Sequence, residues 1–176
     1  MFVHVFVLGI DPGLTRCGYC VLEVVADTRG RHSPKAVALG VIRTEPGEPL
    51  HLRLGELQRE IRAIIAEYPP AVMAIERVLF QVNVSTAMSV GQTSGIAMAE
   101  AANAGCDVVQ YSPNEVKLAV AGWGGADKTQ IQQMVTTLLG LDTIPQPADA
   151  ADAAALALCH VAMAPMLAAV AAKARS

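Results

Sequence analysis

Residues Phe6 to Gly18 read FVLGIDPGLTRCG, and this stretch decides the fold of the chain. Its apolar first half predicts a buried β-strand that ends at Asp11, where Pro12-Gly13 turns the chain. A carboxylate at the end of a buried strand costs free energy unless something compensates for it. We therefore interpret Asp11 as a candidate metal ligand, although a turn residue before Pro-Gly would give the same local pattern.

Strands and helices follow outward from this stretch in a regular order. Turn signals separate three predicted strands, Val3–Ile10, Gly18–Val25 and Ala36–Arg43, and their short connections indicate an antiparallel meander. Two more strands are predicted at Ala71–Glu76 and Asp107–Tyr111. Helices are predicted at Leu50–Glu67, Ser85–Ala104, Pro113–Val120 and Lys128–Leu139, with a last one from about Asp149. This order predicts an α/β fold in a single domain, residues 1–176, with a mixed five-stranded sheet, three antiparallel strands and then parallel ones, flanked by helices.

The composition limits the functions that fit. Of the 176 residues, 53% are hydrophobic and 4% aromatic, which is enough for one aliphatic core. A formal charge of −3 does not suit a strongly basic nucleic-acid-binding protein. Setting aside Asp11 and three further candidate site acids, described below, leaves acidic and basic residues close to balance, so a local basic patch would suffice for a polyanionic substrate.

Two features of the composition bear on the compartment. The chain has four cysteines, Cys17, Cys20, Cys106 and Cys159. One C-x-x-C pair, on a predicted strand, is no zinc site, so we expect buried free thiols and a reducing cytoplasm. The uncharged window Ala153–Ala172 is long enough to span a bilayer, but weakly hydrophobic alanine dominates it. We expect a buried helix there and no membrane segment.

Three further acids lie in settings like that of Asp11. Glu76 ends an apolar strand, where glutamate is disfavoured. Asp149 and Asp152 are spaced to share one helix face, although the helix dipole alone also favours acids in a first turn. Ligands of α/β sheets gather at the carboxyl ends of strands, where Asp11 and Glu76 both fall. Four such carboxylates fit a two-Mg²⁺ site that hydrolyses phosphodiesters.

Basic, polar and aromatic residues near these acids are candidates for contacting a nucleic acid. Lys117 and Lys128 lie near predicted helix starts or loops, where solvated surface lysines are also common. Phe80 follows a strand end and is the best candidate for stacking on a base, with ordinary packing as the alternative. A polar set that could contact a backbone follows Glu76: Arg77, Asn83, Ser85, Gln92 and Ser94.

Six motifs, in order along nearly the whole chain, resemble those of the bacterial crossover-junction endonuclease family RuvC. They are Gly9-Ile10-Asp11-Pro12-Gly13, Ala74-Ile75-Glu76-Arg77-Val78, Gly91-Gln92, Glu115-Val116-Lys117, Ala126-Asp127-Lys128 and Ala148-Asp149-Ala150-Ala151-Asp152-Ala153. The resemblance implies an RNase H-like fold, a homodimer, and Mg²⁺-dependent resolution of four-way (Holliday) DNA junctions by symmetric nicks. It also implies that Mn²⁺ can substitute and that the RuvA–RuvB branch-migration motor is a partner.

The resemblance also implies residue roles. Asp11, Glu76, Asp149 and Asp152 match the metal-binding catalytic acids, which hold two Mg²⁺ per subunit. Lys117 and Lys128 match the family's lysines that hold the junction near the scissile phosphate. Arg77, Phe80, Asn83 and Gln92, taken from the residues themselves, complete the expected DNA contacts. Two positions depart from the family: Leu79 replaces an aromatic residue, and Ser94 replaces a basic one.

The helix Ser85–Ala104 is the predicted dimer interface, because small or flexible residues permit close helix approach. They are Ala87, Met88, Gly91, Gly95, Ala97, Met98, Ala101 and Ala102, of which Met98 is expected to be exposed. Packing of this face on the chain's own sheet is the alternative. Three other functions stay open: an actin-like ATPase, which shares the strand–Asp–x–Gly pattern but needs two domains, a non-catalytic junction-binding protein, and an RNase H-like nuclease acting on RNA.

Overall fold

The structure, a computed structural model, describes residues 3–26, 32–78 and 84–174. These residues form β1 (Val3–Asp11), β2 (Arg16–Ala26), β3 (His32–Arg43), α1 (Leu50–Glu67), β4 (Pro70–Glu76), α2 (Val84–Asn103), β5 (Asp107–Tyr111), α3 (Pro113–Ala121), α4 (Lys128–Leu139) and α5 (Ala148–Ala174). The predicted order is confirmed. β2 and β3 are longer than predicted, because their pairing continues from Arg16↔Arg43 to Ala26↔His32.

The sheet is mixed, as predicted, with the strand order β3-β2-β1-β4-β5. β1 pairs antiparallel with β2, and β2 pairs antiparallel with β3. β4 runs parallel to β1, and β5 runs parallel to β4. The carboxyl ends of β1, β4 and β5 therefore meet at one edge of the sheet, where parallel strands usually present their functional residues.

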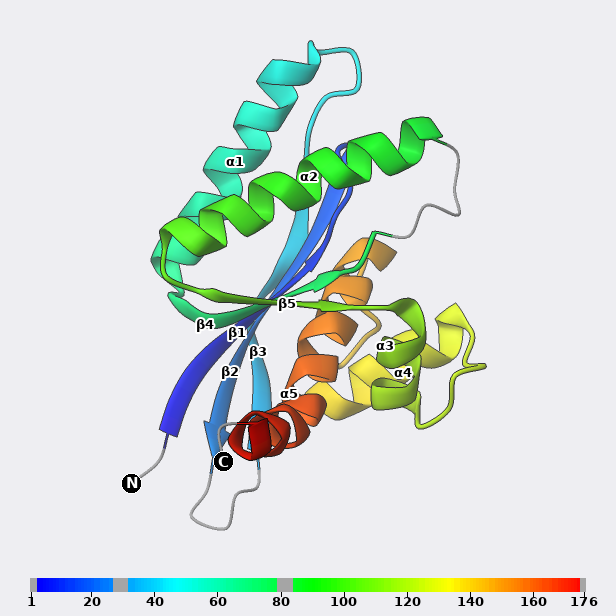
Figure 1. Cartoon of the computed structure of the whole chain (residues 1–176). Coiled ribbons are helices and arrows are strands. Elements are labelled where there is room, and N and C mark those ends of the chain that lie inside the picture. Colours follow the sequence, from blue (N-terminus) through cyan, green and yellow to red (C-terminus); the bar gives the residue numbers. More distant parts are fainter. Residues whose placement is uncertain (1–2, 27–31, 79–83, 175–176) are drawn as a thin grey trace.

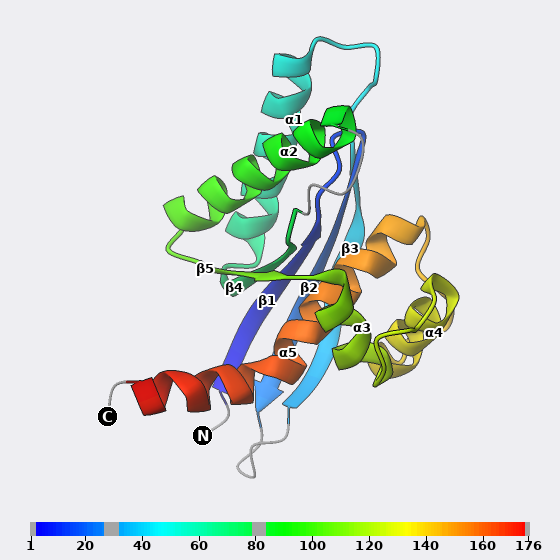
Figure 2. The same cartoon turned by 45° about the vertical axis from the view of Figure 1, so that its right-hand side comes forward.

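Helices cover both faces of this sheet. Figures 1 and 2 show α1 and α2 on one face, and α5 with α3 and α4 on the other. On the first face, Leu8 and Ile10 of β1 pack with Leu57 of α1 in one apolar cluster. On the second, Val7 of β1 packs with the alanines of α5 in another. Because side chains alternate along β1, odd-numbered residues near its end face α5.

A buried carboxylate joins α1 to α2. Glu100 on α2 is only 4% exposed, and its carboxylate accepts hydrogen bonds from Arg62 at 2.8 Å and from Gln58 at 2.6 Å. These hydrogen bonds lower the pKa of Glu100 to about 2, and the bond from Arg62 has the larger effect. The carboxylate therefore stays ionised, and its two partners on α1 tie α2 to that helix.

The predicted dimer face of α2 is divided between two sides of the helix. Ala97 and Ala101 are fully buried in the chain's own core, whereas Met88 is 61% exposed. Met98 was expected to be exposed, and this is wrong. It is half-buried because it faces β5, where the Gln110 side-chain amide donates a hydrogen bond to its sulfur at 3.3 Å. The exposed side of α2 still carries small residues, Gly95, Ala99 and Ala102.

The thiols and the alanine-rich window lie inside the fold. All four cysteines are free and buried, as predicted. Burial raises the pKa of Cys17 and Cys20 to about 12, so neither is a reactive thiolate. In α5, residues 150, 151 and 153–160 are buried. Among the described residues, no helix is long and apolar enough to cross a membrane.

Candidate active site

Two of the predicted acids come from adjacent strand ends. Asp11 is the last residue of β1, and Glu76 is the last residue of β4. They follow Ile10 and Ile75, which pair in the parallel ladder. Neighbouring strands lie about 4.8 Å apart, so the acids leave the sheet side by side. Asp11 has the same orientation as Gly9, two residues earlier, which packs directly against α5.

Two glycines let α5 approach the sheet at this edge. A Cβ on Gly9 would collide with the backbone carbonyl of Ala153, and a Cβ on Gly18 with that of Asp149. Gly18 is also the residue that pairs with Asp11 across the β1–β2 ladder. The first turns of α5 therefore lie on bare strand backbone beside Asp11. Glycine inside a strand is the sequence signal that predicts such an approach.

Both acids of α5 are paired with cations. The Lys128 ammonium donates a hydrogen bond to Asp152 Oδ2 at 2.7 Å. Arg16 Nε, at the start of β2, lies 3.5 Å from Asp149 Oδ2. Sequence reasoning proposed Lys128 but missed Arg16, because its strand was predicted to begin two residues later.

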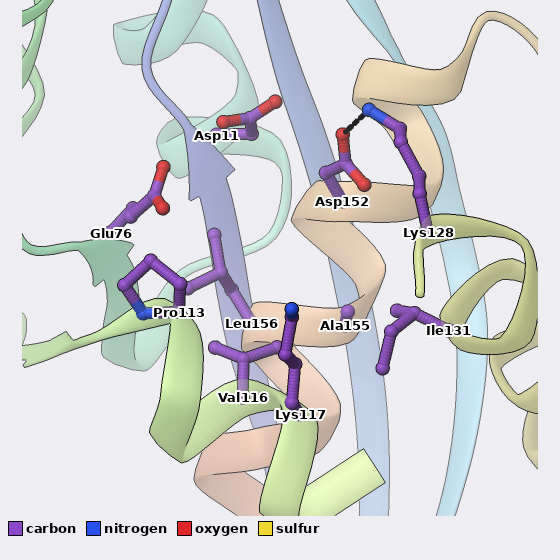
Figure 3. A pocket seen from close by; sticks show the side chains of 10 residues that line it. All are labelled: Asp11, Glu76, Pro113, Val116, Lys117, Lys128, Ile131, Asp152, Ala155 and Leu156. Atoms are coloured by element: carbon purple, nitrogen blue, oxygen red, sulfur yellow. Dashed lines mark hydrogen bonds and ion pairs between the residues drawn. The ribbon is translucent and has the colours of Figure 1, made fainter. Parts of the chain in front are cut away.

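The cavity between these elements holds about 280 Å³. Three acids and two lysines line it, Asp11, Glu76, Asp152, Lys117 and Lys128, over an apolar floor that includes Ile131 and Leu156. Figure 3 shows the acids at the upper part of the cavity, with the ammonium of Lys117 directed toward them from α3. Asp149 is not among the lining residues, so the structure brings together three of the four predicted acids in the cavity and places the fourth one helical turn away.

The start of α3 is held firmly, and this places Lys117. Ser112 caps the helix: its hydroxyl accepts from the backbone N–H of Glu115, and the Glu115 carboxylate accepts from the backbone N–H of Ser112 at 2.7 Å. Such reciprocal bonds satisfy N–H groups that the first turn leaves unpaired. Lys117, which lines the cavity, lies in the turn that follows this capped first turn.

The acids repel one another although Lys128 lies among them. The pKa of Asp11 is raised to about 7, first by burial and then by the charges of Asp152, Glu76 and Asp149, with Lys128 acting in the opposite direction. Burial and Asp152 also raise the pKa of Glu76. The hydrogen bond to Asp152 raises the pKa of Lys128. This local excess of negative charge attracts cations.

The donor set fits a hard divalent ion in its chemistry, because every acidic donor is a carboxylate oxygen. Among the described residues, however, no group of three or more His, Cys, Asp or Glu side chains is gathered tightly enough to hold a metal ion as it stands. One oxygen of Asp152 is engaged by Lys128. The described residues thus suit Mg²⁺ in the type and charge of their donor atoms, but they are not gathered around one ion position.

A buried hydrogen bond ties this edge of the sheet to α5. The Tyr111 hydroxyl and His160 Nδ1 lie 2.8 Å apart, and both residues are buried. Tyr111 pairs with Glu76 in the β4–β5 ladder, and its carbonyl accepts from the backbone N–H of Arg77 at 2.8 Å. It also precedes the Ser112 cap of α3. One contact therefore joins β4, β5, α3 and α5.

The other predicted DNA contacts that the structure describes, Arg77 and Gln92, do not line the cavity, and they differ in how far they are exposed. Arg77 is half exposed, donates a hydrogen bond to the carbonyl of Gln110 at 3.2 Å and lies 4.0 Å from Glu115. Gln92 is half-buried on α2. Phe80 and Asn83, like Leu79, lie outside the described residues. Their predicted roles in DNA binding stay predictions.

Ser94 does not lie on the surface. It is 3% exposed, and its hydroxyl has no hydrogen-bond partner among the described residues. The hydroxyl of the neighbouring Thr93 is also buried and has no hydrogen-bond partner among the described residues. The prediction that Ser94 could contact a backbone is wrong, because α2 turns this residue toward the core.

Comparison with known proteins gives a consistent result. Residues 7–160 match the family described as Crossover junction endodeoxyribonuclease RuvC. A curated relative of that name from Salinispora arenicola is 53% identical over 88% of this chain and 86% of its own length. Another, from Corynebacterium diphtheriae, is 51% identical over 92% and 96%. The structure of Thermus thermophilus RuvC in complex with Holliday junction substrate has a TM-score of 0.85 at 34% identity, covering 93% of this chain and 96% of that one.

Proposed function

The chain belongs to the RuvC family of crossover junction endodeoxyribonucleases, and we propose that it resolves four-way DNA junctions in recombination and repair by paired symmetric nicks. The observation that carries this proposal is the meeting of Asp11, Glu76 and Asp152 in one cavity with Lys117 and Lys128. Acids that attract a cation and lysines that attract a phosphate are both needed for phosphodiester hydrolysis. The fold, RNase H-like as in the related structures, supports this proposal because the carboxyl ends of β1 and β4 lie beside α5.

We propose that Asp11, Glu76, Asp149 and Asp152 hold two Mg²⁺ ions, with Mn²⁺ as a substitute. When bound, the ions would supply an activated water and stabilise the leaving 3′ oxygen. The raised pKa of Asp11, about 7, makes cation binding compete with protonation below neutral pH. Lys117 and Lys128 would hold the scissile phosphate against these acids. Arg77, Asn83 and Gln92 would contact the backbone farther out, and Phe80 would stack on a base.

A substrate panel tests the proposed activity. The purified protein is incubated in Mg²⁺ with a mobile four-way junction, a linear duplex of the same sequence, and an RNA–DNA hybrid. We expect cleavage of the junction alone. Preferential cleavage of the hybrid would favour an RNase instead, and junction binding without any cleavage would favour a non-catalytic binding protein.

The choice of metal tests the role of the carboxylates. Mg²⁺ and Mn²⁺ are expected to support cleavage, because both accept all-oxygen ligands in regular geometry. Ca²⁺, which is larger and coordinated more loosely, is expected to support junction binding without cleavage. Cleavage that persists in EDTA would rule out the metal-dependent mechanism.

We propose a homodimer, because two equivalent strands of a junction are cut most simply by two sites related by a two-fold axis. The exposed side of α2, with Met88, Gly95, Ala99 and Ala102, is its candidate interface. Met88→Glu is expected to give a folded monomer that nicks one strand without coordination. Sedimentation shows the oligomeric state, and a variant that remains dimeric would exclude this side of α2 as the interface.

The remaining parts of the proposal concern the cell. We propose that residues 1–176 act as one nuclease domain, that the RuvA–RuvB motor delivers the junction, and that the protein works in the cytoplasm. The reduced, buried state of all four cysteines suits that compartment. Co-sedimentation of the protein with RuvA and RuvB on junction DNA tests the partnership.

A further inference from the structure

Two arginines lie next to each other at the sheet edge that carries the acids. Arg16 begins β2, Arg43 ends β3, and the two are directly paired in the antiparallel ladder. Directly paired residues point to the same face of a sheet. Arg16 contacts Asp149 on α5, and Gly18, two residues on, touches the same helix turn. Both arginines therefore leave the sheet on the face that carries the acids.

This pairing costs stability by itself. Like charges directly opposite each other on neighbouring strands repel. Arg16 is about half exposed and has one carboxylate partner, Asp149, at 3.5 Å. Arg43 is exposed, and no hydrogen bond or ion pair to it occurs within residues 3–26, 32–78 and 84–174. The protein's own acids leave this pair of cations undercompensated, and an external anion would relieve the repulsion.

The arrangement repeats that of Lys128. Each of the two acids of α5 is paired with a cation from a different element, Asp152 with Lys128 of α4 and Asp149 with Arg16 of β2. Arginine is the better of the two cations for binding a phosphate through two parallel hydrogen bonds. Arg43 adds a second guanidinium next to the first, as a chain of successive phosphates requires.

We propose that Arg16 and Arg43 form a second phosphate-binding subsite, which holds the DNA backbone on the β2–β3 side of the acids. The inference rests on the proposed function, since it takes junction DNA as the ligand. It adds a contact surface on β2 and β3, formed by two residues that were not among the predicted DNA contacts. The subsite positions the backbone and reads no bases, so its contribution is independent of the junction's sequence.

Junction binding measured at several salt concentrations tests the subsite. Binding is followed in Ca²⁺ for the wild type, Arg16→Ala, Arg43→Ala and the double variant. Each lost phosphate contact is expected to weaken binding about eightfold at 0.1 M salt, and to make the plot of log K against log salt shallower by about 0.9. Arg43→Lys is expected to keep most of the slope, because lysine still neutralises a phosphate.

Lys35→Ala is the matched control. Lys35 is exposed on the same strand as Arg43, roughly 26 Å away along β3 at 3.3 Å per residue. Its replacement by alanine is expected to leave both the affinity and the salt slope unchanged. If Arg43→Ala binds the junction with the same affinity and salt slope as Lys35→Ala and the wild type, the subsite is overturned and the proposed function is not. A wild type that binds the junction no better than a linear duplex would overturn the proposed function, and the subsite with it. Melting temperatures of all variants confirm that they are folded.

Discussion

Asp11→Asn should make the metal-free protein more stable while removing its activity. Raising a carboxyl pKa from 3.8 to about 7 costs the ionised, folded state on the order of 4 kcal/mol. Burial and three neighbouring carboxylates cause that cost. Asparagine carries no charge and keeps the shape of the side chain, so most of the cost disappears. With about 2–4 °C per kcal/mol in a protein of this size, we expect Tm to rise by about 10 °C at pH 8.

The pH dependence identifies the cause. Below about pH 4 Asp11 is protonated in both the folded and the unfolded state, so the wild type and Asp11→Asn should differ little. Between about pH 4 and 7 only the unfolded state ionises, and wild-type stability falls as the pH rises. Above pH 7 the difference is complete. Thermal melts in EDTA at pH 4, 5.5 and 8 trace this curve.

Controls separate local repulsion from net charge. Asp107→Asn removes an equal charge from an exposed position at the opposite end of β5, and is expected to change Tm little at any pH. Mg²⁺ should then stabilise the wild type strongly and Asp11→Asn weakly, because a ligand stabilises the state that binds it. An Asp11→Asn protein that is no more stable than wild type at pH 8 would refute the account of Asp11 as a member of a repelling carboxylate cluster.

Three further outcomes are expected. Glu76→Gln and Asp152→Asn should each abolish cleavage but leave junction binding in Ca²⁺ unchanged, and a folded variant that loses both would argue against a role in metal binding alone. Lys117→Ala should lower the cleavage rate more than the affinity, because a charge beside the scissile phosphate acts mostly in the transition state; single-turnover rates near wild type would show an ordinary surface lysine. Gly18→Ala should push α5 off the sheet, cost about 1–3 kcal/mol and reduce cleavage, measured by urea unfolding and the same rate assay; wild-type stability would show that the close approach is not required.

The strand ends could be predicted from the sequence because their signals are local. Asp11 and Glu76 each follow an apolar run, and parallel pairing of β1 with β4 brings such ends together. The face shared by Asp149 and Asp152 follows from helical spacing alone. These three elements account for most of the candidate site, and the fold places them as expected.

Contacts between distant elements could not be predicted in this way. The ion pair of Arg16 with Asp149 depends on the strand beginning before Gly18 and on how closely α5 approaches it. The burial of Ser94 depends on how α2 is rotated on the sheet, which its small residues leave undecided because they occur on both sides of the helix. Packing between elements, and no local pattern, settles both.

Mapping the cuts on one mobile four-way junction tests the central claim most directly. The wild type and Asp152→Asn are incubated with the labelled junction in Mg²⁺, and the products are resolved strand by strand. The account predicts two symmetric nicks in opposing strands for the wild type, ends that a ligase reseals, and no nicks for the variant. Equal cleavage by Asp152→Asn, or wild-type cuts that are not symmetric across the junction, would contradict it.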